Sequence, residues 1–375
     1  MKYLLTLFLS LLSFSFVWGE SDKTPVDWKL SGRLFIDGSV FIRSPRQFHN
    51  GAHIPDVRLA AKVRFGSEWS TKIDVGFANN KITLKDAFLE YGKEGNYFRA
   101  GYMLGYFSMD ESTSTNDFIF HTGSNVTETF YPDRRIGLSY TRSLATYYFS
   151  FGAFCGDGLT FSEEVEPGYN FTGRGVWRPV HEEGRLFHLG TGLLFKVPNK
   201  DTETGKRSLR LKSKGVTYLP SPRLLDMTLE SVRNQLQTNV ECLFFREKWM
   251  MQTEYLLMRV QQAAAPAFMA QGGYIQGGFL IRGRRFAYDA IDALPVMPVD
   301  PHSILLACRY NYTDLNDASS RLFGGSQHDL SVGINYYFNR YLSSRLNYAR
   351  VWTDRYAAQG KCSLNVMQVR LQVRF

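Results

Sequence analysis

The chain ends on the stretch Leu364–Phe375, LNVMQVRLQVRF, in which apolar and polar side chains alternate. The apolar face carries Val369, Leu371, Val373 and Phe375. The polar face carries Gln368, Arg370, Gln372 and Arg374. A period of two describes a β-strand that contacts an apolar medium on one side and water on the other. Because the chain ends on this pattern with an aromatic residue, we predict that the strand closes a barrel whose outer face meets lipid.

The first nineteen residues are predicted to be a cleaved secretory signal peptide. Lys2 gives a positively charged start, Tyr3 to Val17 is apolar apart from Thr and Ser, and Val17-Trp18-Gly19 offers a cleavage site. An uncleaved membrane anchor is the alternative, which the short apolar run and the long β-patterned chain after it disfavour. We therefore expect 1–19 to be the signal peptide and 20–375 to form one barrel domain.

The composition after the signal fits a barrel that spans a membrane. No later apolar run reaches the ~20 residues that a spanning helix requires. A closed barrel crosses a bilayer because each strand pairs its backbone groups with its neighbours. Half of each strand is then polar, so the mean hydropathy resembles that of a soluble chain. The 15% of aromatic residues and the 32 glycines agree with strands and tight turns.

The excess of positive charge indicates which classes of partner the protein could bind. The chain has 44 Lys and Arg residues, 35 Asp and Glu residues and a net charge of +9, which suggests nucleic acid, acidic lipid or anionic solutes. Secretion argues against nucleic acid. Four scattered cysteines, without CxxC spacing, predict neither a disulfide framework nor a metal site, and nothing indicates a cofactor.

Sixteen segments of the mature chain carry the alternating pattern and are predicted to be antiparallel strands. They lie near 28–43, 57–65, 69–78, 82–91, 96–104, 134–142, 146–155, 169–178, 186–197, 235–245, 249–259, 272–283, 303–312, 328–338, 342–352 and 364–375. Short links alternate with longer ones, as expected of a barrel with short periplasmic turns and long outer loops. The fold class is therefore all-β, a sixteen-stranded transmembrane barrel.

Three connections are unusually long. Gly105–Asp133 and Pro198–Asn234 are the longest outer loops, whereas Gly283–His302 falls on the periplasmic side and is interpreted as an ordered, Pro-rich extension. Aromatic residues near strand ends predict interfacial girdles, with the buried core of a soluble sandwich as the alternative. These girdle residues are Trp28, Trp69, Tyr91, Trp177, Tyr336, Tyr337, Tyr341 and Trp352.

Short stretches spread over most of the chain follow a recognisable order. They are Ser31–Leu34, Asp56–Ala60, Trp69–Phe77, Lys85–Tyr91, Arg99–Gly101, Tyr106–Asp110, Ser112–Thr115, Arg134–Gly137, Gly168–Arg174 and Leu186–Gly190. Together they resemble the phosphate-selective porin O and P family of outer-membrane channels. The resemblance implies a sixteen-stranded barrel, usually trimeric, with a third loop folded into the pore. It also implies a lumen of Arg and Lys that passes phosphate or other anions.

Four positions depart from the family pattern. Leu59 stands in place of a second Arg, Tyr106 replaces a Pro, and Asp110 replaces a longer Glu. No basic residue stands near the end of the third-loop motif, where the chain has Phe120-His121-Thr122-Gly123. These changes leave the fold intact and the choice of anion open.

Selecting anions requires fixed positive charge inside the pore, and Arg suits phosphate because its planar fork donates two parallel hydrogen bonds. By strand parity, the predicted anion pathway is Arg33, Arg43, Arg58, Lys62, Arg64, Arg99, Arg135, Arg174, Arg178 and Arg309. Arg345, Arg370 and Arg374 share these faces, the last two as structural residues at the rim. Few acids are expected there, Asp37 and Asp74 being the clearest. Charges that only pair across strands are the alternative interpretation.

The loop Gly105–Asp133 is the predicted constriction, because its aromatic residues need an apolar partner such as the inner wall. Its candidate residues are Tyr106, Phe107, Asp110, Phe118 and Phe120. An exposed binding loop is the competing interpretation. The basic fifth outer loop predicts either a vestibule that concentrates anions or a contact with lipopolysaccharide.

The sequence therefore predicts an anion-preferring outer-membrane porin, in contact with outer-membrane lipid, that acts as a homotrimer and not as an enzyme. A non-selective or cation pore and a barrel that serves as an adhesin are the alternatives. An outer-membrane hydrolase is disfavoured because His328 and Ser331 face opposite sides of one strand. His49 and His53 could share a metal only on a helix, which Pro45, Gly51 and Pro55 oppose.

Overall fold

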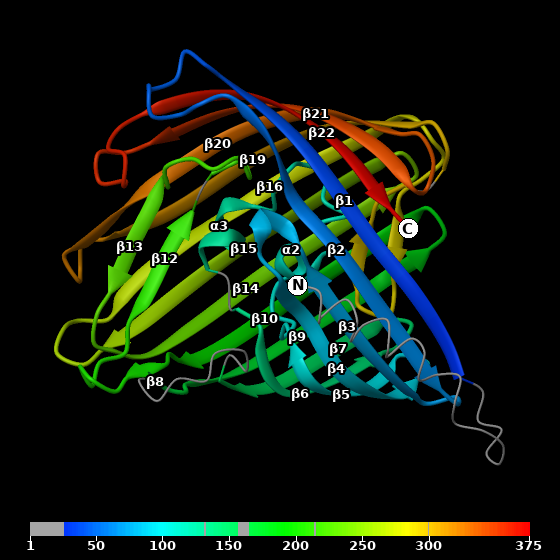
Figure 1. The fold of residues 1–375 in the computed structure, drawn as a ribbon, viewed down its shortest axis with the longest axis horizontal. Helices are drawn as coiled ribbons and strands as arrows, with labels where there is room; N and C mark the ends of the chain where they lie inside the picture. The colour runs from blue at the N-terminus through cyan, green and yellow to red at the C-terminus, as the bar shows by residue number, and fades with distance from the viewer. Residues whose placement is uncertain (1–25, 131–132, 157–164, 214, 299) are drawn as a thin grey trace.

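The computed structural model describes residues 26–130, 133–156, 165–213, 215–298 and 300–375, and the expected signal peptide, 1–19, lies outside them. Sixteen antiparallel strands form a closed barrel (Figure 1), in which each strand pairs with its neighbours in the chain and the first pairs with the last. The strands are β1 (Val26–Ile42), β2 (Gly51–Phe65), β3 (Trp69–Gly76), β4 (Thr83–Lys93), β5 (Asn96–Met103), β6 (Arg135–Ser143), β7 (Tyr147–Cys155), β9 (Tyr169–Glu182), β10 (Arg185–Val197), β14 (Val232–Arg246), β15 (Trp249–Gln262), β16 (Phe268–Arg282), β19 (Ser303–Asp317), β20 (Leu322–Tyr337), β21 (Leu342–Thr353) and β22 (Ser363–Arg374). The predicted fold class and all sixteen strands are confirmed.

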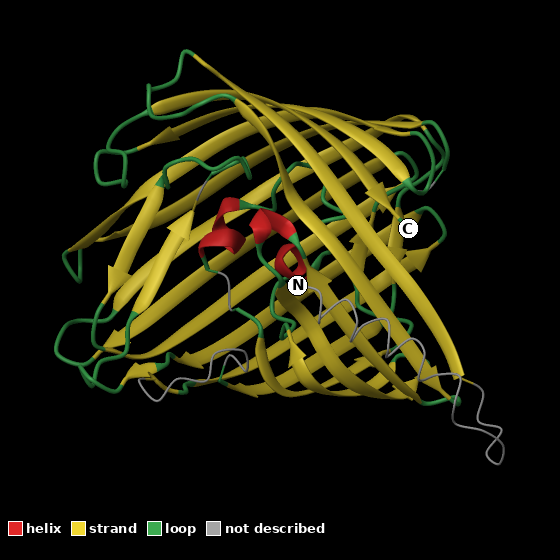
Figure 2. Cartoon of the chain, viewed as in Figure 1, coloured by secondary structure: helices red, strands yellow, loops and turns green. Residues whose placement is uncertain are grey.

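The remaining elements lie in the connections between barrel strands. They are the helices η1 (Ala78–Asn80), α2 (Met109–Ser112) and α3 (Asn125–Thr129), and the short strands β8 (Val165–Glu166), β11 (Lys200–Asp201), β12 (Leu209–Ser213), β13 (Leu225–Leu229), β17 (Ala287–Asp289) and β18 (Leu294–Val296). The helices α2 and α3 belong to the third outer loop (Figure 2). None of the helices in the described part of the chain is long and apolar enough to cross a membrane.

Side chains along the strands are sorted in the reverse of a soluble core. On β14 the inward Gln237 and Glu241 are fully buried, whereas the outward Val240 is 59% exposed. On β6 the outward Leu138 is 65% exposed. A pleated strand sends alternate residues to opposite faces, so the polar set lines the lumen and the apolar set is presented to lipid.

The barrel closes between the two ends of the chain. β1 pairs with β22 from Arg33 opposite Arg374 to Ile42 opposite Asn365. The last residue extends the ladder, since the Gly32 N–H donates to the Phe375 carbonyl at 3.0 Å and the Phe375 N–H donates back at 3.1 Å. Gly32 also makes room for the terminal ring, because a Cβ built on it would lie 2.6 Å from Phe375 Cζ.

The two ends of the barrel differ in their connections. Six turns at one end are two to four residues long, whereas the opposite end carries the long outer loops. The long turn 283–302 lies at the short-turn end and forms the β17–β18 hairpin, which is the expected ordered extension and is called the periplasmic hairpin below.

The prediction that Tyr337 belongs to the aromatic girdle is wrong. Trp28 and Trp69 are exposed on the outer surface, at 64% and 46%. Tyr337 is instead 3% exposed, and its hydroxyl lies 3.0 Å from Met297 Sδ of the periplasmic hairpin. Tyr336 and Tyr337 are neighbours on one strand, so they cannot both face lipid. The ring of Tyr337 faces the lumen, where it contacts the periplasmic hairpin.

Replacing Gly32 with Ala should weaken closure of the barrel, because the new methyl group would crowd both Phe375 and the Arg58 carbonyl oxygen, 2.9 Å away. We expect the free energy of unfolding to fall by about 1–3 kcal/mol. The measurement is the urea midpoint of the barrel, followed by the mobility difference between heated and unheated samples. The control is Gly277→Ala, whose nearest neighbouring atom would be 3.7 Å away. Equal midpoints for the two variants would contradict the crowding.

Candidate functional site

A large cavity of about 1080 Å³ lies in the lumen, on the side of strands β1–β6. Its other boundaries come from the third outer loop (105–133), the fifth outer loop (198–231) and the periplasmic hairpin. The two outer loops enter from one end of the barrel and the periplasmic hairpin enters from the other. The cavity therefore extends from the outer loops towards the periplasmic side. It is the candidate passage for solutes.

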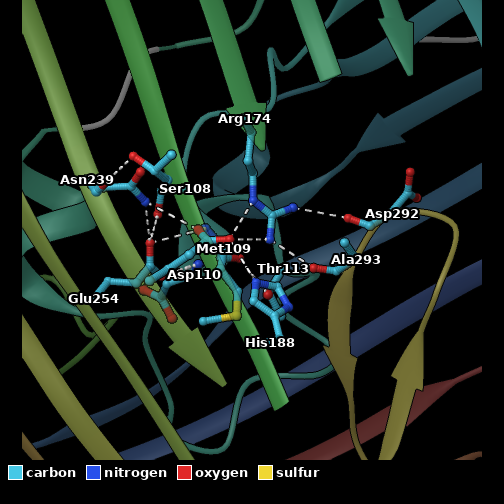
Figure 3. A network of polar contacts seen from close by, with 12 residues as sticks. Ser108, Met109, Asp110, Thr113, Arg174, His188, Asn239, Glu254, Asp292 and Ala293 are labelled. Atoms are coloured by element: carbon cyan, nitrogen blue, oxygen red, sulfur yellow. Dashed lines mark hydrogen bonds and ion pairs between the residues drawn. The ribbon is translucent and has the colours of Figure 1, made fainter. Parts of the chain in front are cut away.

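Two wall carboxylates hold the start of the third outer loop. Glu254 of β15 accepts hydrogen bonds from Ser108 Oγ at 2.7 Å and from the N–H groups of Met109 and Asp110 at 3.1 and 2.6 Å (Figure 3). Glu241 of β14 accepts from the same Met109 N–H at 2.9 Å. The first N–H groups of a helix have no partner inside it, so the carboxylates satisfy donors that would otherwise be buried unpaired.

The rest of the loop is held through its carbonyl groups. Arg309 of β19 donates to the Thr122 carbonyl at 2.9 Å, and Arg345 of β21 donates to the Phe120 carbonyl at 3.1 Å. Asn335 of β20 donates to a third carbonyl, that of Ile119. These contacts place the loop against the wall β14–β22 and leave the β1–β6 wall facing the cavity.

Arg174 and Arg178 of β9 hold the periplasmic hairpin in the same way. Arg174 donates to the carbonyls of Asp292 and Ala293 at 3.1 and 2.8 Å, and Arg178 donates to the Ala290 carbonyl at 2.8 Å (Figure 3 shows the Arg174 contacts). Both arginines are buried. They do not line the cavity, although the sequence suggested that they lie on the anion pathway.

The two inserted segments meet at one buried group. Glu241 accepts from Arg174 at 2.7 Å and lies 3.0 Å from His188 Nε2, while His188 Nδ1 lies 2.9 Å from Tyr288 Oη of the hairpin. Since Glu241 also accepts from Met109, the third outer loop and the periplasmic hairpin share a single wall anchor.

Four residues of the suggested pathway line the cavity on β1–β5, and each is paired with a carboxylate. Their ion pairs are Arg33–Asp56 at 2.6 Å, Arg58–Asp56 at 3.1 Å, Lys62–Glu90 at 2.9 Å and Arg99–Glu90 at 2.7 Å. Lys72 adds a pair with Asp86 at 2.8 Å. Lys62 is the most accessible of these cations, with 42% of its side chain exposed.

The expectation of few acids on these faces is wrong. Asp56, Asp86 and Glu90 pair with the wall cations, in addition to the expected Asp74. Strand parity could have found them, because Asp86 and Glu90 are four residues apart on β4 and Asp56 is two residues before Arg58 on β2.

Cations still outnumber carboxylates on this wall. Seven cations from the β1–β6 side line the cavity, namely Arg33, Arg58, Lys62, Lys72, Arg99, Arg134 and Arg135. The carboxylates on the same side are Asp56, Asp74, Asp86 and Glu90. The wall therefore keeps a net positive charge after pairing.

The other suggested pathway residues lie elsewhere. Arg43 follows the end of β1 and Arg64 is near the end of β2, and both are exposed and outside the cavity lining. Arg309 donates to the third outer loop and lies 4.6 Å from the centre of the Phe120 ring. Arg370 forms a buried two-bond pair with Asp37, in keeping with a structural role.

The suggested constriction residues divide into two groups. Tyr106, Asp110 and Phe118 line the cavity, whereas Phe107 and Phe120 are buried in apolar clusters with the wall. Packing these rings against the wall removes apolar area from water, which favours the inward position of the loop.

The third outer loop contributes no positive charge to the passage. It contains five acids and neither Lys nor Arg. Its one histidine, His121, is buried beside Asn347, and burial lowers the pKa of His121 to about 3, so the ring stays neutral. Glu111 has no hydrogen-bond partner for its carboxylate among the described residues, and burial raises its pKa well above the ordinary value.

The fifth outer loop is less basic in effect than its composition suggests. Arg210 pairs with Asp226 at 2.6 Å, and Lys200 and Arg207 both pair with Glu166, at 2.8 and 3.2 Å. Its β12–β13 hairpin packs leucines against the third outer loop. The vestibule therefore has fewer unpaired cations than the sequence predicts.

No alternative chemical centre stands out in the described part of the chain. There, no three His, Cys, Asp or Glu side chains are grouped as a metal ion would require. His328 stacks on Trp352 on the outer surface with an interplanar angle of 6°, whereas Ser331 is buried on the inner face, so the two are on opposite sides of β20 as parity predicts.

Replacing Glu254 with Ala should loosen the third outer loop. The change removes the acceptor of the Asp110 N–H, whereas the Met109 N–H keeps Glu241, and a buried donor left unpaired costs about 1–3 kcal/mol. We expect a larger and noisier single-channel conductance in planar bilayers. The control is Glu230→Ala, which removes an exposed acid outside the cavity lining. An unchanged conductance would show that this contact does not hold the loop.

Comparison with known proteins agrees with this geometry. A model of the phosphate-selective porin O and P family matches residues 29–375. An uncharacterised protein of Caulobacter vibrioides is 24% identical over 320 residues, which are 80% of this chain, and the chain spans 63% of that relative's length.

Solved structures share the fold at low identity. The anion-selective porin of Comamonas acidovorans has a TM-score of 0.63, with 10% identity over 94% of this chain and 100% of that one. The outer-membrane channel DcaP of Acinetobacter baumannii has a TM-score of 0.59, with 14% identity over 96% of this chain and 100% of that one. The trimer form of Vibrio cholerae OmpT has a TM-score of 0.61, with 9% identity over 93% of this chain and 99% of that one. Because the family model covers nearly the whole sequence, the chain belongs to the phosphate-selective porin O and P family.

Proposed function

We propose that this porin forms a water-filled channel that prefers small anions and that its anion path follows the β1–β6 wall. The observation that carries the proposal is the excess of cations on that wall, seven against four carboxylates, beside a cavity of about 1080 Å³. A charged wall of low dielectric raises the local concentration of ions of opposite sign. The similar porin of Comamonas acidovorans is anion-selective, which is in keeping with this.

Pairing sets the strength of the preference. Arg33 and Arg58 share Asp56, and Lys62 and Arg99 share Glu90, so each carboxylate partly neutralises two cations. An anion that enters the passage meets a weak and graded attraction, which permits fast release. The preference is thus for small anions in general, and phosphate is one of several that can pass.

Replacing Arg58 and Lys62 together with Glu should weaken or reverse the anion preference, because the wall would lose its positive excess. The measurement is the reversal potential in a salt gradient across a planar bilayer. The control is Lys206→Glu with Lys361→Glu, which makes the same change of charge on exposed outer loops away from the cavity. A cation-selective wild type, or an unchanged potential in the Arg58 and Lys62 variant, would overturn the proposal.

The same recordings separate the remaining alternatives. Millimolar phosphate should leave the chloride current nearly unchanged, since the described residues along the path form no cage of unpaired cations. Strong block by phosphate would favour a dedicated phosphate site, and equal passage of both ions would favour a non-selective pore. A purified, folded barrel without any conductance would favour the adhesin and enzyme interpretations.

We further propose that the protein is a homotrimer whose apolar outer face contacts outer-membrane lipid. Support comes from family membership and from the trimer form of the similar Vibrio cholerae OmpT. The expected result is three times the single-chain mass, measured by native mass spectrometry in mild detergent. A single-chain mass under conditions that keep the barrel folded would contradict the trimer.

A further inference from the structure

Apolar side chains that are only half buried form part of the cavity lining. One of them belongs to the basic wall itself, and most of the others come from the segments inserted into the lumen. This group, called the apolar lining below, consists of Phe88 of β4, Leu104 after β5, Tyr106 and Phe118 of the third outer loop, Tyr218 of the fifth outer loop and Val296 of the periplasmic hairpin. Because these residues line the cavity, their uncovered surface is available to a solute inside the barrel.

The acids of the third outer loop are occupied by contacts or buried. Asp117 pairs with Arg374 at 3.0 Å, and Asp133 pairs with Lys196 at 3.4 Å. Both carboxylate oxygens of Glu111 are buried. These groups therefore leave the loop to meet a solute largely through its apolar side chains.

The acids of the periplasmic hairpin are engaged in the same way. Asp292 is ion-paired with Arg99 at 3.8 Å, and Asp289 accepts from the N–H groups of Ile291 and Asp292 at 2.8 and 3.3 Å. Val296 of the same hairpin is half buried and lines the cavity. The hairpin thus adds apolar surface to the passage as well.

The apolar lining adjoins the cations of the wall. The centre of the Phe88 ring lies 5.4 Å from Arg99 Cζ and 6.0 Å from Lys72 Nζ. The hydroxyl of Tyr106 accepts from Arg99 Nη1 at 3.0 Å. Positive charge and aromatic rings therefore occur together at β3, β4 and β5.

Such a lining distinguishes between classes of anion. A hydrated inorganic anion gains nothing from apolar surface, because its charge must stay solvated beside it. An anion with an apolar body can direct its charged group to the accessible Lys62 and Lys72 and remove apolar area from water against the lining. Sites for organic solutes commonly combine a few charged groups with apolar and aromatic walls.

We propose that the preferred solutes of this channel are small aromatic carboxylates, which carry a carboxylate on an apolar ring. This inference rests on the proposed anion channel and specifies its substrate class. A ring is favoured over an aliphatic chain because four of the six residues of the apolar lining are aromatic, and aromatic pairs attract in offset or edge-to-face arrangements. The contacts are partly solvated, so the solute is retained weakly and released quickly.

The test compares benzoate with nicotinate, two flat anions of nearly equal size and equal charge. Nicotinate has a ring nitrogen in place of one C–H group, so its ring is much more polar. Each is placed opposite chloride across a planar bilayer at a mildly alkaline pH, and the reversal potential gives its permeability relative to chloride. A bilayer without protein gives the background. We expect benzoate to be about threefold more permeable than nicotinate, as partial burial of one ring would produce.

A double variant makes part of the apolar lining polar, by Phe118→Gln and Val296→Thr. Val296→Thr conserves the volume of the side chain, and Phe118 is only half buried, so the barrel should stay folded. The ratio of benzoate to nicotinate permeability should fall towards equality, whereas the preference for chloride over sodium should not change. The matched control is Phe77→Gln with Val165→Thr, two exposed positions outside the cavity lining, which should keep the wild-type ratio.

The outcomes separate this inference from the channel itself. Equal permeability of benzoate and nicotinate through the wild-type protein would overturn the preference for aromatic carboxylates and leave the anion channel intact. Passage of chloride without either organic anion would do the same. A wild-type ratio in the Phe118 and Val296 variant would overturn the role of the apolar lining. A wild-type protein that conducts no ions, or that prefers sodium to chloride, would instead contradict the proposed function.

Discussion

Pairing of β1 with β22 is the constraint on which the rest of this structure depends. Lipid offers no partner to a backbone N–H or carbonyl group, so a sheet in a membrane must have no open edge. The chain meets this requirement up to its last residue, where Phe375 and Gly32 exchange two backbone hydrogen bonds. Once the sheet is closed, the alternation of each strand fixes an apolar outside and a polar inside, and every further feature is built in that polar interior.

Much of the charge in the lumen is used to hold inserted segments. Glu254 and Glu241 accept from the backbone N–H groups that begin α2, and Arg174, Arg309 and Arg345 donate to backbone carbonyls. Buried backbone groups need partners, and charged side chains provide strong ones. As a result the arginines that are most deeply buried are the least available to a passing solute.

The charges left around the cavity define what can pass. The β1–β6 wall retains a positive excess after pairing with Asp56, Asp74, Asp86 and Glu90, while the third outer loop and the periplasmic hairpin contribute acids. Family membership describes the fold and the general class of channel. We propose that the selectivity of this chain follows from the sign of charge along its own passage, and the third outer loop without a basic residue is the main departure.

The sequence by itself determined the barrel, because a period of two depends only on the pleat of a single strand. This period predicted all sixteen strands, and it also predicted that Arg58 and Lys62 face the lumen. Parity could not tell a cation that lines the passage from one, such as Arg178, that donates to an inserted hairpin. That distinction depends on contacts between residues more than a hundred positions apart, which only the tertiary structure brings together.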